Sequence, residues 1–173
     1  CKKAYGPSEV ILSTDSNELS ILASNIGIHS LITEKLCNSG SERIASVMRE
    51  LMEIAWKEKF SEINKPDSIF QKKLKQTLII NVQGDQPFLD PNVITRMYEY
   101  FSTSNELPEV VTPIYKLKKK DIHNEAVVKT LLNQKNEAIY FSRTPLPFVR
   151  DKDKSSWHLH YDYWGHVGIY GYR

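Results

Sequence analysis

The chain has 173 residues, of which 40% are hydrophobic and 25% charged, a composition typical of one soluble domain with its own core. Lysine and arginine (23) barely exceed aspartate and glutamate (21), which argues against a protein built mainly to neutralise nucleic acid. Two cysteines are too few for a disulfide framework, and no apolar stretch approaches the ~20 residues that cross a membrane, so we expect a reducing, cytoplasmic setting.

The first half of the chain predicts alternating strands and helices. Residues 9–14 (EVILST) and 28–33 (IHSLIT) are typical of strands, and the apolar positions of 17–26 have helical spacing before Gly27, a residue type that often ends helices. Ser39 and Glu42 have capping-box spacing, and the apolar stripe that follows predicts one long helix. The lysine-rich segment 57–76 predicts a frayed helix end and a long surface loop.

The second half predicts further strands and one hairpin. Residues 77–82 (TLIINV) form the most apolar run and predict a central strand, and Pro91 is expected to open a helix to about Phe101. Residues 109–115 (EVVTPIY) predict a strand, residues 126–143 a hairpin with a polar turn at 133–136, and the alternating segment 165–173 (GHVGIYGYR) the last strand. This order indicates an α/β fold with a mostly parallel sheet.

Polar residues follow the apolar run in IINVQGDQPF. Gln83, Gly84 and Asp85 stand just past this strand, as Asp15 stands past the first one. Ligands of open α/β sheets bind at the carboxyl ends of the strands, where a carboxylate can hold Mg²⁺ and a glycine admits a ligand to the backbone. The alternative is an ordinary Gly-Asp turn.

Three other motifs carry weaker signals. In NSGSER, Ser39, Gly40 and Arg43 surround a helix start that favours an anion, although the motif on its own favours a plain N-cap. Arg143 and Arg150 are suited to a carboxylate or phosphate, or are surface arginines. His166, Gly168, Tyr170 and Tyr172 are predicted to share one strand face, as a pocket wall or as core residues.

The motifs STD, NSGSER, NVQGDQP, YFSRTPLPF and HVGIYGYR occur in this order between residues 9 and 173. This set resembles the 3-deoxy-manno-octulosonate (KDO) cytidylyltransferases of lipopolysaccharide biosynthesis, also called CMP-KDO synthetases. The resemblance implies a Rossmann-like three-layer α/β/α nucleotidyltransferase fold, transfer of CMP from CTP to KDO with release of pyrophosphate, and a homodimer. We therefore expect one incomplete domain over residues 1–173, with a lysine-rich insertion at about 57–76.

The resemblance also implies roles for individual residues. Asp85 matches the aspartate that holds catalytic Mg²⁺, and Gln83 matches an amide beside the sugar acid. Ser39, Gly40 and Arg43 match the family's motif on the nucleotide side of the site. Arg143 and Arg150 match arginines near the acidic sugar, and Arg143 is also expected to be catalytic. His166 and Tyr170 match the pocket wall that receives the sugar.

The chain departs from the family pattern at several positions, and these departures leave alternative functions open. Cys37 replaces the family's usual histidine, Ser41 replaces threonine, and the family's upstream arginine- and lysine-rich loop and its late aspartate have no counterpart here. If the chain were the complete molecule, we would expect it to be inactive; an internal portion of an active enzyme is the more economical interpretation. The alternatives are a cytidylyltransferase for another acidic sugar, such as a sialic acid, and a non-catalytic nucleotide-binding remnant.

Overall fold

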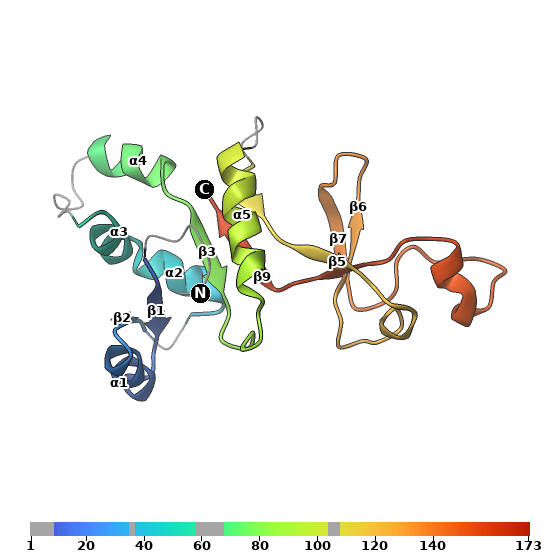
Figure 1. Ribbon diagram of the computed structural model, residues 1–173, viewed down its shortest axis with the longest axis horizontal. Helices are drawn as coiled ribbons and strands as arrows, with labels where there is room; N and C mark the ends of the chain where they lie inside the picture. The colour runs from blue at the N-terminus through green and yellow to red at the C-terminus, as the bar shows by residue number, and fades with distance from the viewer. Residues whose placement is uncertain (1–8, 35–36, 58–67, 104–107) are drawn as a thin grey trace. The chain divides into compact units, whose positions relative to one another are not determined.

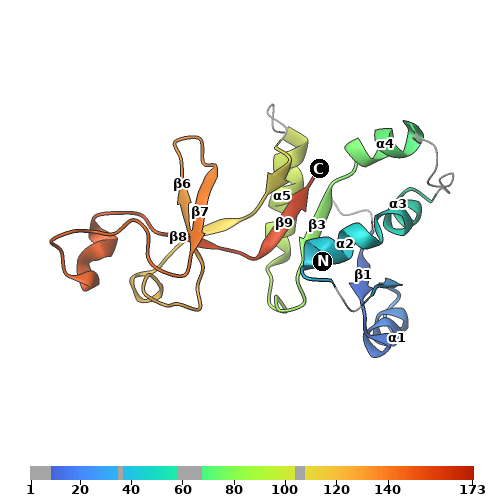
Figure 2. The ribbon, with the colours of Figure 1, turned by 180° about the vertical axis from the view of Figure 1, so that it is seen from behind.

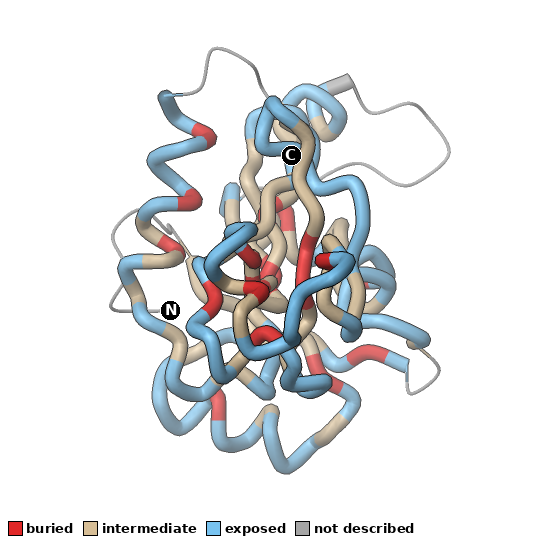
Figure 3. Tube along the Cα trace, turned by 90° about the vertical axis from the view of Figure 1, so that its right-hand side faces the viewer, coloured by how far each residue is buried: buried red, intermediate tan, exposed pale blue. Residues whose placement is uncertain are grey.

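The computed structural model describes residues 9–34, 37–57, 68–103 and 108–173 (Figure 1). It separates into two compact units, one comprising Cys1–Val111 with Tyr170–Arg173 and the other Thr112–Ile169. Most of the described trace is exposed or half-buried, and the buried residues occur in short stretches (Figure 3).

The first unit opens with a βαβ element, as predicted. Strand β1 (Ile11–Thr14) pairs in parallel with β2 (His29–Ile32), and helix α1 (Asn17–Asn25) connects them. Ser16 caps the helix by accepting from the Leu19 backbone N–H at 3.3 Å, and Gly27 follows its end with a φ of 65°, which confirms its expected place. Of the apolar stripe, however, only Ala23 is buried.

The single long helix predicted after Ser39 is wrong. The structure has α2 (Gly40–Ser46) and α3 (Met48–Trp56), separated at Val47, whose φ and ψ of −119° and 24° leave the helical region. The Val47 side chain is buried at this break, so the apolar stripe runs through it without interruption. Hydrophobic spacing therefore indicated the buried face correctly but gave no sign of the change in backbone direction.

The lysine-rich segment contains a helix, α4 (Ser68–Lys75), where a surface loop was predicted. The Lys73 ammonium lies 4.6 Å from the centre of the Trp56 ring, and the Trp56 indole N–H donates to Thr77 Oγ1 at 2.9 Å. These contacts give the polar helix a partner on α3, which its composition alone did not show. The rest of the predicted loop, residues 58–67, lies outside the described residues.

A three-stranded sheet completes the first unit, with the order β3 (Ile79–Val82), β9 (Ile169–Tyr172), β4 (Val110–Val111). Strand β3 is thus an edge strand of the described sheet, and its predicted central position is wrong. Helix α5 (Pro91–Thr103) begins at Pro91 as expected and runs beside β9 (Figures 1 and 2). A Cβ on Gly171 would stand 2.7 Å from the Phe101 ring, so only glycine permits this approach.

The second unit is an antiparallel sheet in the order β5 (Ile114–Lys116), β8 (Trp164–His166), β6 (Lys129–Leu132), β7 (Ala138–Ser142). The β6–β7 hairpin is confirmed (Figure 2); the Asn133 carboxamide oxygen accepts from the backbone N–H of Lys135 and Glu137 in its turn. Two short 3-10 helices, η1 (Lys119–Asp121) and η2 (Lys154–Leu159), border a core of Leu117, Ile122, Val149, Trp157 and Tyr163.

Two predicted strands are each divided between the sheets. EVVTPIY supplies β4 and β5, and GHVGIYGYR supplies β8 and β9, with breaks at 112–113 and 167–168. The Thr112 hydroxyl lies 3.2 Å from the Val167 carbonyl and 2.8 Å from the Ile169 carbonyl, and so fastens the two breaks together. The prediction that His166 shares one strand face with Tyr170 is therefore wrong.

The α/β class is confirmed, with mixed pairing. Among the described residues β1 and β2 pair in parallel, whereas the pairings of β4, β5, β6, β7 and β8 are antiparallel. In the same residues no helix combines the length and the apolar character needed to cross a membrane.

Candidate functional site

Asp85 lies in a turn directly after β3. The Gln86 backbone N–H donates to the Gln83 carbonyl at 3.2 Å, which places Gly84 and Asp85 at the two central positions. Gln83, Gly84 and Asp85 are all exposed. The ordinary turn that the sequence left open is thus present, and it displays the carboxylate and the amide to solvent at the carboxyl end of the strand.

The turn itself gives no reason for a glycine at position 84. A Cβ at Gly84 would meet no heavy atom within 4 Å, and its φ lies outside the left-handed region that favours glycine. Position 84 therefore tolerates a side chain as far as the fold is concerned. The bare backbone leaves open space at position 84, one residue before Asp85, and a bare backbone is the condition for close approach of a ligand.

The NSGSER motif forms the start of α2. Ser39 Oγ accepts from the Glu42 N–H at 3.1 Å, and the Glu42 carboxylate accepts from the Asn38 N–H at 2.6 Å. The predicted capping box is present, with its return bond shifted by one residue to Asn38. Because the Ser39 hydroxyl serves this cap, it holds the loop in shape.

Arg43 joins the α2 motif to the end of β1. Its guanidinium lies 3.3 Å from the Asp15 carboxylate and donates to the Thr33 hydroxyl and, at 3.3 Å, to the Glu34 carbonyl. The sequence placed Asp15 at a strand end without a contact, and the structure supplies one. Arg43 is therefore a link between the loop and the strand ends on either side of it.

Asn81 is a residue that the sequence analysis missed. It lies on β3, is 7% exposed, and its amide nitrogen has no hydrogen-bond partner among the described residues. The same nitrogen is 3.4 Å from the position of a Cβ on Gly40, so β3 and the start of α2 are neighbours. A polar residue inside the apolar run IINV was the signal that pointed to it.

Tyr170 and Tyr172 share one side of β9. Their rings stack with centres 6.2 Å apart, and the Tyr172 hydroxyl lies 2.6 Å from Ser41 Oγ. Burial raises the pKa of Tyr170, and the nearby Tyr172 raises it further, so the hydroxyl stays protonated at neutral pH. The last strand is thereby tied to the NSGSER motif through Ser41, a contact that no sequence spacing indicated.

The two arginines of the second unit have different surroundings. Arg143 follows β7, and its Nη1 donates to the carbonyls of Glu125 at 3.0 Å and Ala126 at 3.4 Å. Arg150 donates through Nε to the Asp151 carboxylate at 3.0 Å, and its side chain is 87% exposed. Arg150 therefore fits the surface alternative, whereas Arg143 is oriented by backbone carbonyls.

His166 ends β8 and is half-buried against Phe141, with ring centres 4.7 Å apart. Its Nε2 lies 2.8 Å from Thr112 Oγ1. The same Thr112 hydroxyl also contacts two carbonyls, and the direction of its bond to His166 depends on the tautomer of the imidazole. Burial lowers the pKa of His166, which keeps the imidazole neutral at neutral pH.

The predicted site residues fall into two groups. Ser39, Gly40, Arg43, Gln83, Asp85 and Tyr170 belong to the first unit, and Arg143, Arg150 and His166 to the second. Contacts within the first unit bring the α2 motif together with Asp15, Asn81 and Tyr172. In the described part of the chain, no hydrogen bond or ion pair connects the Gln83 or Asp85 side chains to that group.

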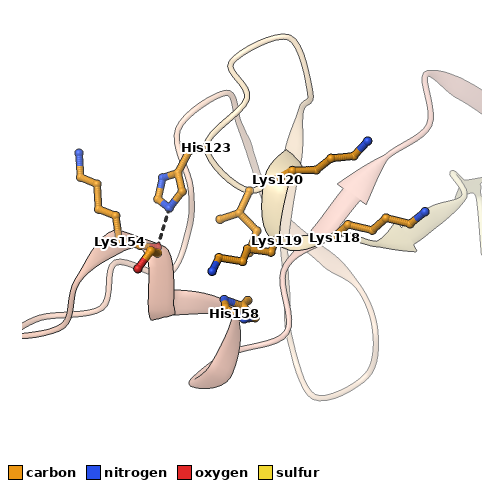
Figure 4. Close-up of a pocket in the computed structure, with 8 residues that line it drawn as sticks. Lys118, Lys119, Lys120, His123, Lys154 and His158 are labelled. Atoms are coloured by element: carbon orange, nitrogen blue, oxygen red, sulfur yellow. Dashed lines mark hydrogen bonds between the residues drawn. The ribbon is translucent and has the colours of Figure 1, made fainter.

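A hollow of about 540 Å³ in the second unit is lined by none of these residues. In Figure 4 the side chains of Lys118 and Lys120 extend away from the rings of His123 and His158. His123 Nε2 contacts the Lys154 carbonyl at 3.1 Å. The lysines of this loop are exposed, as is typical of a solvated charge cluster.

Mg²⁺ fits the Asp85 turn as a partial site. Magnesium binds through one or two carboxylates together with waters and substrate phosphates, so an exposed carboxylate beside open backbone suffices on the protein side. The described residues contain no group of three or more His, Cys, Asp or Glu side chains that would form a complete protein cage. The donor set is therefore suited to a metal that a nucleotide triphosphate brings with it.

Comparison with known families identifies the class of this protein. Residues 64–173 match the family model described as "Cytidylyltransferase", which covers more than half of the chain. The chain belongs to this family. The resemblance found from the motifs is confirmed, since its curated relatives carry the name 3-deoxy-manno-octulosonate cytidylyltransferase.

Three such relatives indicate the level of similarity. The protein of Nitrosococcus oceani is 29% identical over 97% of this chain and 59% of its own length. Those of Polynucleobacter necessarius and Actinobacillus pleuropneumoniae serotype 7 are each 32% identical, over 95% and 97% of this chain and 56% and 60% of their own lengths. The chain thus spans less than two thirds of the length of these relatives.

A solved structure agrees with the family assignment. The structure of CMP:2-keto-3-deoxy-manno-octonic acid synthetase complexed with CTP superimposes with a TM-score of 0.70 and 25% identity, over 99% of this chain and 59% of that one. The nucleotidyltransferase fold implied by the sequence is confirmed by this match.

Proposed function

We propose that the protein to which this chain belongs transfers CMP from CTP to KDO, giving CMP-KDO and pyrophosphate for lipopolysaccharide biosynthesis in the cytoplasm. The observation that carries this proposal is the ordered run of motifs along the chain, together with its 29% and 32% identity to relatives of that name over 97% and 95% of its length. The anomeric hydroxyl of the sugar attacks the α-phosphate of CTP in line, and the bond from that phosphorus to the pyrophosphate oxygen breaks.

The chain's own residues act by binding and orientation, because the reaction needs no protein nucleophile. The backbone of the Ser39–Gly40 loop, held in shape by Arg43, receives the nucleotide. Asp85 would hold Mg²⁺, which when bound neutralises charge on the α-phosphate. Gln83 presents its exposed amide to the sugar acid beside the same turn.

The family resemblance assigns the sugar acid to Arg143, Arg150, His166 and Tyr170. Arg143 and Arg150 offset the charge of the carboxylate, so that two anions can approach each other. The neutral His166 ring and the protonated Tyr170 hydroxyl are suited to hydrogen bonds with sugar hydroxyls. Arg143 is the stronger of the two arginine candidates because no carboxylate of the described residues pairs with it.

We also propose a homodimer that uses strand β7. Ile139, Tyr140 and Phe141 are successive residues of this edge strand, and they are 60%, 59% and 42% exposed. An exposed apolar edge strand invites pairing with another chain, and a second copy would cover it.

Substitution Asp85→Asn in the full-length protein tests the function. The side chain is exposed, so the variant should fold as the wild type does, while Mg²⁺-dependent release of pyrophosphate from CTP and KDO should be abolished. Turnover close to that of the wild type would contradict the metal assignment. Turnover with a sialic acid in place of KDO would show that the sugar is assigned wrongly.

A further inference from the structure

Lys129 is a buried cation that the proposed mechanism does not use. Its residue is 1% exposed in the second unit, on strand β6. The ammonium group donates to three backbone carbonyls, those of Asn124 at 2.6 Å, Val127 at 3.0 Å and Arg143 at 2.8 Å. An ammonium has three N–H donors, so all of them are satisfied by this ring of acceptors.

Arg143 holds the two central residues of the same loop. Its Nη1 donates to the carbonyls of Glu125 and Ala126, so Lys129 and Arg143 together occupy the carbonyls of four consecutive residues, 124–127. The Arg143 carbonyl is in turn an acceptor of the ammonium. The two cations therefore brace one loop, and the backbone of Arg143 is fixed at the point where its side chain leaves β7.

Neither cation forms an ion pair within the described residues. No carboxylate of these residues lies within ion-pair distance of Lys129 or Arg143. Burial lowers the pKa of Lys129, the more distant Glu125 carboxylate opposes this shift, and the positive charge of Arg143 adds to it to a smaller extent. A buried charge of this kind costs stability that an apolar residue of similar length would avoid, so its presence calls for a function.

We propose that Lys129 is a positioning residue for Arg143, which it holds ready to receive the carboxylate of the acidic sugar. This inference rests on the proposed function. Nη1 of Arg143 is committed to the loop, while Nε and Nη2 have no acceptor among the described residues. Those donors are the ones that a carboxylate engages with a fork of two parallel hydrogen bonds, and the geometry of such a fork depends on where the arginine backbone is held.

The test compares Lys129→Met with Lys135→Met in the full-length protein. Methionine keeps the length of the buried chain without its donors, and Lys135 is an exposed lysine in the turn of the same hairpin. We expect Lys129→Met to raise the KM for KDO roughly tenfold or more, the loss expected when a charge-assisted hydrogen bond is misplaced, with the KM for CTP unchanged. Lys135→Met should change neither constant.

A purely structural role would give another pattern. A lower melting temperature in Lys129→Met with both KM values unchanged would overturn the inference, as would an equal rise in both. If Lys129→Met does not fold, Lys129→Gln, which keeps two N–H donors, decides between the same outcomes: a selective rise in the KM for KDO supports the inference and an unselective one overturns it.

A measurement without substrate separates this inference from the proposed function. The ¹⁵N NMR signals of the Arg143 guanidinium should report restricted rotation in the wild type and in Lys135→Met, and free rotation in Lys129→Met. If the wild type shows no KDO-dependent release of pyrophosphate, the proposed function fails. The NMR comparison then still decides whether Lys129 positions Arg143, and unchanged signals in Lys129→Met would refute it.

Discussion

The substitution Gly84→Ala tests whether Gly84, in the turn after β3, is only a turn residue or also leaves room for a ligand. The added methyl group would meet no protein atom within 4 Å, and the backbone at position 84 is not in the left-handed region. The substitution should therefore not destabilise the folded state, and alanine lowers the conformational entropy of the unfolded chain. We expect the free energy of unfolding to stay the same or to rise by up to about 1 kcal/mol.

The kcat of Gly84→Ala, in contrast, should fall. The methyl group occupies the open space beside Asp85, where the proposed site admits its ligands. Displacing a reacting group by about 1 Å costs on the order of 100-fold in rate, so a loss of this order in kcat is expected. Urea unfolding and a pyrophosphate-release assay on the same preparation of the full-length protein measure the two effects.

Gly171→Ala is the matched control, because there the fold does require glycine. Its Cβ would stand 2.7 Å from the Phe101 ring and 3.2 Å from the Met97 methyl group, so overpacking should destabilise the protein by about 1–3 kcal/mol. If Gly84→Ala keeps full turnover while Gly171→Ala shows the expected loss of stability, Gly84 is a turn residue and the argument for ligand approach is refuted.

Three further predictions follow from individual contacts. Asp15→Asn removes an ion pair whose side chains are 20% and 38% exposed, so urea unfolding should show a loss of no more than about 1 kcal/mol, and a larger loss would contradict this estimate. Tyr140→Lys places a charge on the exposed edge of β7 and should convert a dimer to monomers in light scattering; an unchanged mass would exclude this surface. Because burial lowers the pKa of His166 below its ordinary 6.5, the unfolded chain binds the proton first, so the stabilisation is complete above that pH and is lost on acidification through the lowered pKa. His166→Asn should flatten this part of the pH–stability profile, and an unaltered slope would assign it to other groups.

The sequence predicted local elements better than their assembly. The first strands, the start of α5 at Pro91 and the β6–β7 hairpin follow from residue spacing and turn chemistry, both of which act over a few positions. Residue spacing does not predict that GHVGIYGYR passes from one sheet to another. The alternation of side chains indicates which face of a strand each residue occupies, but it does not indicate which strand lies next to it. The Thr112 hydroxyl that fastens this crossing lies 55 residues away from Val167.

The candidate site shows the same limit. Strand ends and motif order brought Gln83, Asp85, Arg43 and Arg143 to attention, since each carries chemistry that is visible in its residue type. The partners of these residues could not be predicted from the sequence. Arg43 and Asp15 are 28 residues apart in the chain, and Tyr172 and Ser41 are 131 residues apart. Spacing rules operate within one element, whereas these contacts arise only when separate elements pack.

The two arginines of the second unit show why residue type alone ranks candidates poorly. In the sequence, Arg143 and Arg150 are equivalent carboxylate binders, separated only by a proline-stiffened segment. In the structure Arg150 already faces the Asp151 carboxylate, whereas Arg143 is oriented by carbonyls that fix its position and leave its charge uncompensated. A ligand carboxylate must displace Asp151 to reach Arg150 but displaces nothing at Arg143. Truncation of Arg143 should therefore weaken binding of the acidic sugar more than truncation of Arg150 does.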